Sequence, residues 1–193
     1  MSGERAFRII KSEFRVIGID DGRFIPHKKG EVIVVGVVFR GGDSIEGVMH
    51  TKILVDGLDA TIKLSKMINS SPHHRQLRLI MLNGLTLAGF NIVNIKQLNE
   101  ATGIPVLVFI RKKPDMDSIY EAIKCLPNSE DRWQIILNAG KIFEVRHKEV
   151  KIYLELAGLS LVDAVEVLAV TSRRAILPEP LRVAHLIASG ITS

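Results

Sequence analysis

The order of the apolar runs is the feature that most constrains the fold of this chain. Its first half holds three runs rich in Val and Ile, at 15–19, 31–40 and 45–55, and a Gly-Gly-Asp-Ser turn at 41–44 joins the last two. Such runs predict β-strands, and a short glycine turn between two of them predicts a hairpin. The first half therefore predicts three antiparallel strands, apolar enough at their centres to be covered on both faces.

The second half of the sequence alternates strands with helices. A strand at 77–82, a helix at 93–101 and a strand at 105–110 follow one another, with Gly103 as a helix terminator. Together with a helix that begins after Asp59, this order predicts a ribonuclease H-like α/β fold: a mixed sheet of about five strands with helices on both faces. The later elements are expected to be helices at 117–125 and 129–140, a hairpin formed by 141–145 and 150–156, a helix at 160–171 and a last helix from Pro180.

Composition sets the remaining broad limits. The chain has 193 residues, 47% of them hydrophobic, and shows no repeat or linker, so residues 1–193 are expected to form a single domain. The apolar runs are too short to span a membrane and the N-terminus has no signal-like apolar region, which predicts a cytoplasmic protein. The lone Cys125 is expected to be a small buried side chain. A net charge of +5 mildly favours polyanionic partners such as nucleic acid.

Polar residues close two of the predicted strands. Asp20 and Asp21 follow the first strand, and Asn83 follows the strand at 77–82. Neighbouring strands that end in polar residues can gather the oxygen ligands that Mg²⁺ or Mn²⁺ requires. Asn83 offers only a neutral carbonyl oxygen where a metal-dependent nuclease would need an aspartate, so the pattern predicts an altered metal site. We expect Asp20 and Asn83 to lie at the same end of the sheet on adjacent strands.

Two further aspartates, Asp56 and Asp59, are metal-ligand candidates only through the family resemblance described below. Each has a structural alternative, because Asp before Gly is typical of a turn and Asp59 stands where a helix cap is expected. Asp20 itself could be a turn residue after a strand. The sequence leaves these alternatives open.

Two further segments could contact an anion. Gly84, Thr86 and Gly89 follow the strand at 77–82, and glycines there would let backbone N–H groups approach a phosphate or carboxylate. This segment matches neither a P-loop nor a dinucleotide-binding fingerprint.

A run of three basic residues follows the strand at 105–110: Arg111, Lys112 and Lys113. Such a run is often only a solvated cluster, but beside a metal site it would suit a nucleic-acid backbone. His185, on the last predicted helix, is interpreted as a structural histidine.

Several motifs resemble those of a known family. The segments 18–22 (GIDDG), 55–61 (VDGLDAT), 83–91 (NGLTLAGFN) and 178–182 (PEPLR) are similar to an archaeal family of unknown function related to endonuclease V. The match covers nearly all 193 residues, and the order and spacing of the motifs are more specific than any one of them.

The resemblance to endonuclease V implies roles for particular residues. It places the first-strand metal aspartate at Asp20 and the later lysine at Lys112, and it implies a Mg²⁺ or Mn²⁺ cofactor. The family's second carboxylate, a glutamate near the end of the third strand, has no glutamate here, and Asp56 and Asp59 are its nearest substitutes. The family's fourth-strand aspartate falls on Asn83, and the histidine of its late Gly-His pair falls near Leu159. Its strand-parting Pro-Tyr-Ile-Pro wedge is replaced here by residues 39–42.

The resemblance therefore implies a nucleic-acid-acting protein whose metal site is altered. If it is an enzyme, metal-assisted phosphodiester hydrolysis would use Asp20 with Asp56 or Asp59, and Lys112 near the phosphate. The alternative is a catalytically silent protein that binds nucleic acid or a nucleotide.

Overall fold

Seven strands form one mixed sheet at the centre of the protein. The computed structural model describes residues 7 and 13–193. The strands are β1 Arg15–Asp21, β2 Glu31–Arg40, β3 Ser44–Leu54, β4 Leu79–Asn83, β7 Val106–Ile110, β8 Phe143–His147 and β9 Val150–Ala157. Their order in the sheet is β3-β2-β1-β4-β7-β9-β8. β1, β4 and β7 run parallel, and each of the other neighbouring pairs is antiparallel.

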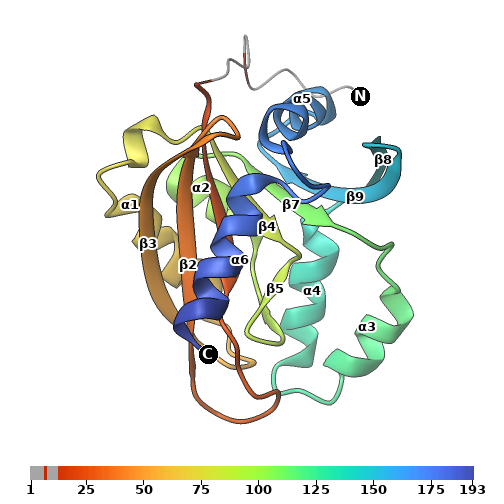
Figure 1. Cartoon of the computed structure of the whole chain (residues 1–193). Helices are drawn as coiled ribbons and strands as arrows, with labels where there is room; N and C mark the ends of the chain where they lie inside the picture. The colour runs from red at the N-terminus through yellow and green to blue at the C-terminus, as the bar shows by residue number, and fades with distance from the viewer. Residues whose placement is uncertain (1–6, 8–12) are drawn as a thin grey trace.

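Helices cover both faces of this sheet (Figure 1). They are α1 Ala60–Asn69, α2 Ile95–Thr102, α3 Met116–Ile123, α4 Ser129–Ala139, α5 Leu161–Thr171 and α6 Glu179–Ile191, with a short 3-10 helix η1 at His74–Gln76. On one face α6 packs along β1, β2 and β4, and α5 lies by β8. On the other face α1 and α2 pack against each other, and α3 and α4 follow beside them.

Two apolar layers result from the alternation of side chains along each strand. In β1, Val16 joins the layer under α5 and α6, whereas Ile17 and Ile19 join the layer under α1 and α2. At Gly18 the backbone of α6 lies so close that a methyl group would overlap the carbonyl of Pro180. A side chain at position 18 would therefore push α6 off the sheet, together with the polar residues that α6 carries.

The parallel pairing of β1 with β4 fixes where the polar strand ends lie. Ile17 pairs with Ile80 and Ile19 with Leu82, so both strands finish at the same edge of the sheet. This confirms the expectation that Asp20 and Asn83 open at one end on adjacent strands. β7 continues the parallel set, with Phe109 beside Asn83, and delivers residues 111–113 to that end as well.

Three expectations from the sequence need correction. The sheet has seven strands, not about five, because the late hairpin β8–β9 pairs with β7 and extends the main sheet. The segment after Asn83 is not only a loop, since β5 Thr86–Leu87 and β6 Asn91–Ile92 pair as a small second sheet. Cys125 is exposed rather than buried, because it follows the C-terminal end of α3. Across residues 13–193, no helix has the length and apolar character that crossing a membrane requires.

Candidate functional site

Asp20 is the centre of a hydrogen-bonded group at the end of β1. Only 4% of its surface is exposed. Its Oδ2 lies 3.0 Å from Nδ1 of His185 on α6 and accepts a weaker contact at 3.4 Å from the Asn83 side-chain amide. Its Oδ1 accepts the backbone N–H of Asp21 at 3.0 Å. The carboxylate is therefore held by a helix, a neighbouring strand and its own chain.

Asp21 turns away from this group. Because successive strand residues point to opposite faces, its carboxylate faces the segment after Asn83, and its Oδ2 accepts the backbone N–H of Ala88 at 2.6 Å. Asp21 is nevertheless near enough for its charge to act on Asp20. The two adjacent aspartates thus contribute to one electrostatic site from two faces of the sheet.

The electrostatics show that this site is short of positive charge. Burial first, and then the charge of Asp21, raises the pKa of Asp20 from 3.8 to about 6, against smaller opposing contributions from the Asp21 amide, His185 and Asn83. Burial also raises the pKa of Asp21. A cation in this position would offset both penalties.

Asp56 lies across the segment at 88–90 from Asp21. It has a positive φ of 51°, and its Oδ1 accepts the backbone N–H of Phe90 at 2.8 Å. His27 stands 3.6 Å from its other oxygen. The amides of Ala88 and Phe90, on either side of Gly89, are therefore occupied by two of the protein's own carboxylates.

Asp59 has a structural role in these contacts. It occupies the N-cap position of α1, but without a side-chain capping bond. Its Oδ1 instead accepts the backbone N–H of Leu54 at 3.1 Å and the side-chain amide of Asn91 at 2.7 Å. The fully buried Asn91 in turn accepts the N–H of Ala60, the first residue of α1. These bonds tie the end of β3 to α1 and β6, and they place Asp59 apart from the contacts of Asp20.

Arg132 fastens the loops around Asp56. It lies on α4, is buried, and donates from Nη2 to the carbonyl of Asp56 at 2.5 Å. Its Nη1 donates to the carbonyls of Gly57 at 3.0 Å and Phe90 at 2.5 Å, and its Nε donates to that of Pro127 at 2.9 Å. One side chain thus joins three separate loops beside the candidate site.

The side chains gathered around Asp20 decide which kind of metal site is possible here. Among residues 13–193, no three His, Cys, Asp or Glu side chains are grouped so as to hold a metal ion. The structure brings together Asp20, Asn83 and His185, with Asp21 close by. Mg²⁺ usually keeps several waters and uses only one or two protein carboxylates together with substrate phosphates. The shortage of positive charge at Asp20 and Asp21 fits a cation held in that way, but not a closed carboxylate cage.

The basic run that follows β7 is solvent-exposed at the same end of the sheet. Arg111, Lys112 and Lys113 are all exposed. Lys112 also lines a cavity of about 240 Å³ between the sheet and helices α3 and α4. Gly84, which directly follows Asn83, lines the same cavity.

Glu155 is the unusual residue in the wall of this cavity. It lies on β9, where it pairs with Val108, and only 3% of its surface is exposed. Within the described part of the chain its Oε2 has no hydrogen-bond partner, and burial raises its pKa from 4.5 to about 7. Most of the other lining residues are apolar, among them Phe90 and Ile136.

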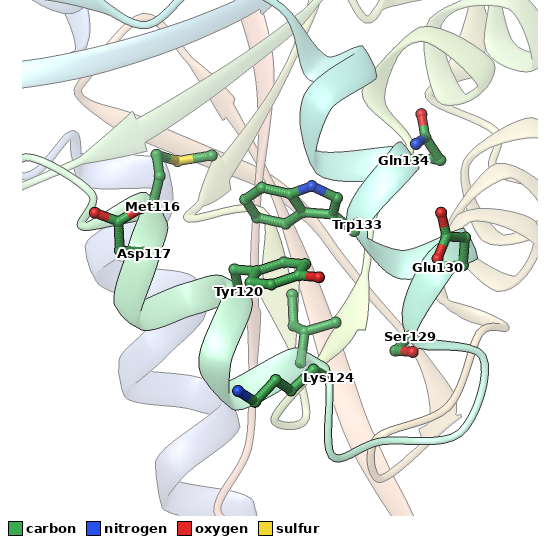
Figure 2. Close-up of a pocket in the computed structure, with 9 residues that line it drawn as sticks. Met116, Asp117, Tyr120, Lys124, Ser129, Glu130, Trp133 and Gln134 are labelled. Atoms are coloured by element: carbon green, nitrogen blue, oxygen red, sulfur yellow. The ribbon is translucent and has the colours of Figure 1, made fainter.

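A second cavity of about 480 Å³ lies between α3 and α4. Figure 2 shows Tyr120 of α3 facing Trp133 of α4, and their ring centroids are 5.0 Å apart in an edge-to-face arrangement. None of the site residues predicted from the sequence lines this cavity.

Sequence reasoning misses three residues of this region. It interprets His185 as structural, although the spacing after Pro180 places this residue on the α6 face that meets β1. Arg132 stands in the first turn of α4 beside Glu130 and Asp131, a pattern typical of a solvent-exposed helix start. Glu155 lies between two leucines, on the strand face that it shares with Lys151 and Tyr153, and this pattern predicts an exposed side chain. Its burial comes from the packing of α2 and α4 against β9.

Comparison with known proteins places this chain in a family. The family model described as Endonuclease dU matches residues 12–192. A UPF0215 protein of Methanothermobacter thermautotrophicus is 48% identical, over 96% of this chain and 91% of the relative. Another UPF0215 protein, from Pyrococcus furiosus, is 42% identical, over 95% of each chain.

Solved structures show the same fold. A protein of unknown function from Archaeoglobus fulgidus superposes with a TM-score of 0.83 at 40% identity, covering 92% of this chain and 98% of that one. Endonuclease V from Bacillus subtilis reaches 0.59 at 12% identity, covering 90% and 78%. Endonuclease V from Ciona intestinalis, in complex with DNA containing an inosine followed by a ribo-adenosine, reaches 0.55 at 13% identity, covering 92% and 88%.

The likeness to the two endonuclease V structures, at such low identity, concerns the fold alone. The family model and the archaeal relatives extend over almost the whole chain and confirm the resemblance found in the sequence motifs. This chain belongs to the family described as Endonuclease dU, a family of archaeal proteins whose fold is related to that of endonuclease V.

Proposed function

We propose that this protein hydrolyses a phosphodiester bond in nucleic acid that contains a deaminated base, with Asp20 at the reaction centre. The observation that carries the proposal is the buried Asp20 carboxylate, held by His185 and Asn83 where the parallel strands β1 and β4 end. The description of the family and the inosine-containing DNA bound by the Ciona neighbour support the substrate class.

Each residue of the site has a separate role in the proposed reaction. A divalent cation held by Asp20, and favoured by the nearby charge of Asp21, would lower the pKa of a bound water and offset charge on the phosphate. Asp20 is kept in one orientation by its three donors. With Nδ1 of His185 donating to Asp20, Nε2 is left as an acceptor that can take a proton from water. Lys112, at the exposed rim, is placed to contact a phosphate of the bound strand.

Cleavage assays on oligonucleotides with a single deoxyuridine or deoxyinosine test the proposal. We expect cleavage with Mg²⁺ or Mn²⁺ that falls to background in Asp20→Asn. Asp43→Asn is the matched control, because Asp43 sits in the turn between β2 and β3 at the opposite end of the sheet, where it pairs with Arg173. Cleavage that survives in Asp20→Asn would remove Asp20 from the reaction. Binding without cleavage under every metal condition would identify the catalytically silent alternative.

Replacing Asn83 with aspartate should make the protein depend more strongly on a divalent cation. Asn83→Asp removes a donor to Asp20 and adds a carboxylate beside it, so the metal-free protein should lose about 1–3 kcal/mol of unfolding free energy. Mn²⁺ should bind more tightly to the variant, because a hard cation prefers an anionic oxygen. Calorimetric titration and thermal denaturation with and without Mn²⁺ measure both effects. Equal Mn²⁺ affinity in the two proteins would contradict the metal assignment.

The basic run after β7 should supply phosphate contacts. Replacing Arg111, Lys112 and Lys113 together with alanine should flatten the dependence of log K on log salt by up to about three units, roughly one for each phosphate that the variant leaves without a cation. Fluorescence anisotropy across a salt series measures this slope. Lys63, Lys66 and Arg75, on and after α1, form a triple-alanine control of equal charge, for which the slope should change less. Equal slopes in both triple variants would show a nonspecific charge effect.

A further inference from the structure

We propose that Glu155 is a specificity-determining residue, and that its carboxyl hydrogen-bonds the edge of a nucleobase held in the 240 Å³ cavity beside Asn83. The identity of the base rests on the function proposed above. The cavity and its carboxyl are independent of that function, since they come from the packing of β9 against α3 and α4.

The cavity has the size and lining of a site for one ring. Pockets for drug-sized ligands are typically about 300–1,000 Å³, so a volume of about 240 Å³ suits a single base rather than a whole nucleotide. Leu85, Phe90, Ile119 and Ile136 make its walls apolar. A flat base would bury its faces against such walls and leave its polar edge to find a partner.

Glu155 is the buried polar group that this edge would meet. A buried carboxyl without a partner costs free energy, so its persistence in a cavity wall calls for a ligand that satisfies it. Within the described residues Glu155 forms no ion pair, although Lys112 lines the same cavity. In its neutral form the carboxyl offers one donor beside one acceptor, because burial favours that form.

The lactam edge of a deaminated base complements such a carboxyl. Uracil and hypoxanthine each present a ring N–H beside a carbonyl oxygen, whereas cytosine and adenine present an unprotonated ring nitrogen beside an amino group. Oε2 is the buried oxygen that lacks a partner in the described chain, so the two carboxyl oxygens are not equivalent. Because the proton of a neutral carboxyl can sit on either oxygen, the group can present its donor and acceptor to a base edge in either order. The proposed function selects the lactam order.

The cavity also has the right position for this task. Gly84 is bonded directly to Asn83, whose amide contacts Asp20, so a base in the cavity would leave its sugar and phosphate near the candidate centre. Lys112 is the residue of the basic run that lines the cavity, and its exposed ammonium would face that phosphate. The residues that recognise the base would then lie next to those that cleave the phosphodiester bond, and each set could be changed without the other.

Binding measured in EDTA tests the proposal without competing cleavage. The probes are thymine-free oligonucleotides of one sequence whose central residue is deoxyuridine, deoxyinosine, deoxycytidine or deoxyadenosine. Wild-type protein should bind the first two at least about tenfold more tightly than the last two. Glu155→Leu should lose that preference, and Glu155→Gln should keep it, since an amide still offers a donor beside an acceptor. Glu144→Gln, on the exposed side of β8, should behave as wild type.

Failure of this inference can be told apart from failure of the proposed function. A methyl-¹³C signal of Met116, which also lines the cavity, should shift on addition of deoxyuridine in wild type but not in Glu155→Leu. If that shift occurs while no oligonucleotide is bound, the cavity inference stands and the proposed function falls. An unchanged preference in Glu155→Leu, or equal binding of all four oligonucleotides, overturns the role of Glu155.

Discussion

Replacing Arg132 with methionine should lower the free energy of unfolding by about 3 kcal/mol or more. Methionine keeps the apolar stem, but it leaves the carbonyls of Pro127, Gly57, Phe90 and Asp56 without their charged donor. Removing a charged donor from several buried carbonyls is among the largest single-residue effects, because the carbonyls left behind stay desolvated. The substitution should also free the loop that carries Asp56.

Urea denaturation gives the stability change, and amide hydrogen exchange gives its location. The amide of Phe90, which donates to Asp56, should lose protection in Arg132→Met before amides of the central strands do. Arg146→Met is the matched control, since Arg146 forms an exposed ion pair with Glu149 and should change stability by less than about 0.5 kcal/mol. A stability within that range for Arg132→Met would show that α4 does not fasten these loops.

Glu155 should make the protein less stable as the pH rises. Its pKa is 4.5 when exposed and about 7 in the folded protein, so the folded state holds the proton more tightly. The contribution of this group is fully present below about pH 4.5 and is lost as the pH rises through 7. A difference of about 2.5 pKa units corresponds to a loss of about 3 kcal/mol.

The comparison with Glu155→Gln isolates this contribution. Asp20, whose pKa is raised to about 6, also lowers the unfolding free energy as the pH rises, but it does so equally in the wild type and in Glu155→Gln. The difference in unfolding free energy between the two proteins should therefore grow between pH 4.5 and 8, with the glutamine variant the more stable at pH 8. Denaturant titrations at several pH values measure it. A constant difference across that range would mean that Glu155 is paired or solvated in the folded protein.

The resemblance and the local patterns predicted different parts of this protein. Apolar runs and glycine turns placed most strands and helices within a few residues, as at β2 and α4, because strand and helix periods are local properties of sequence. They also placed Asp20 beside Asn83, because parallel strands joined by a crossover end at one edge. The ribonuclease H-like assignment itself stays a prediction beyond the shared fold with endonuclease V.

By itself, the sequence determined the order of elements, the family and the strand-end position of Asp20. Tertiary packing alone decided that α6 brings His185 to Asp20, that β9 joins the main sheet, and that Glu155 lies buried without a partner for its Oε2 among the described residues. The reason is physical: burial and hydrogen bonding between residues far apart in the chain depend on which elements pack together. A period of two along a strand shows which residues share a face, but it does not show what covers that face.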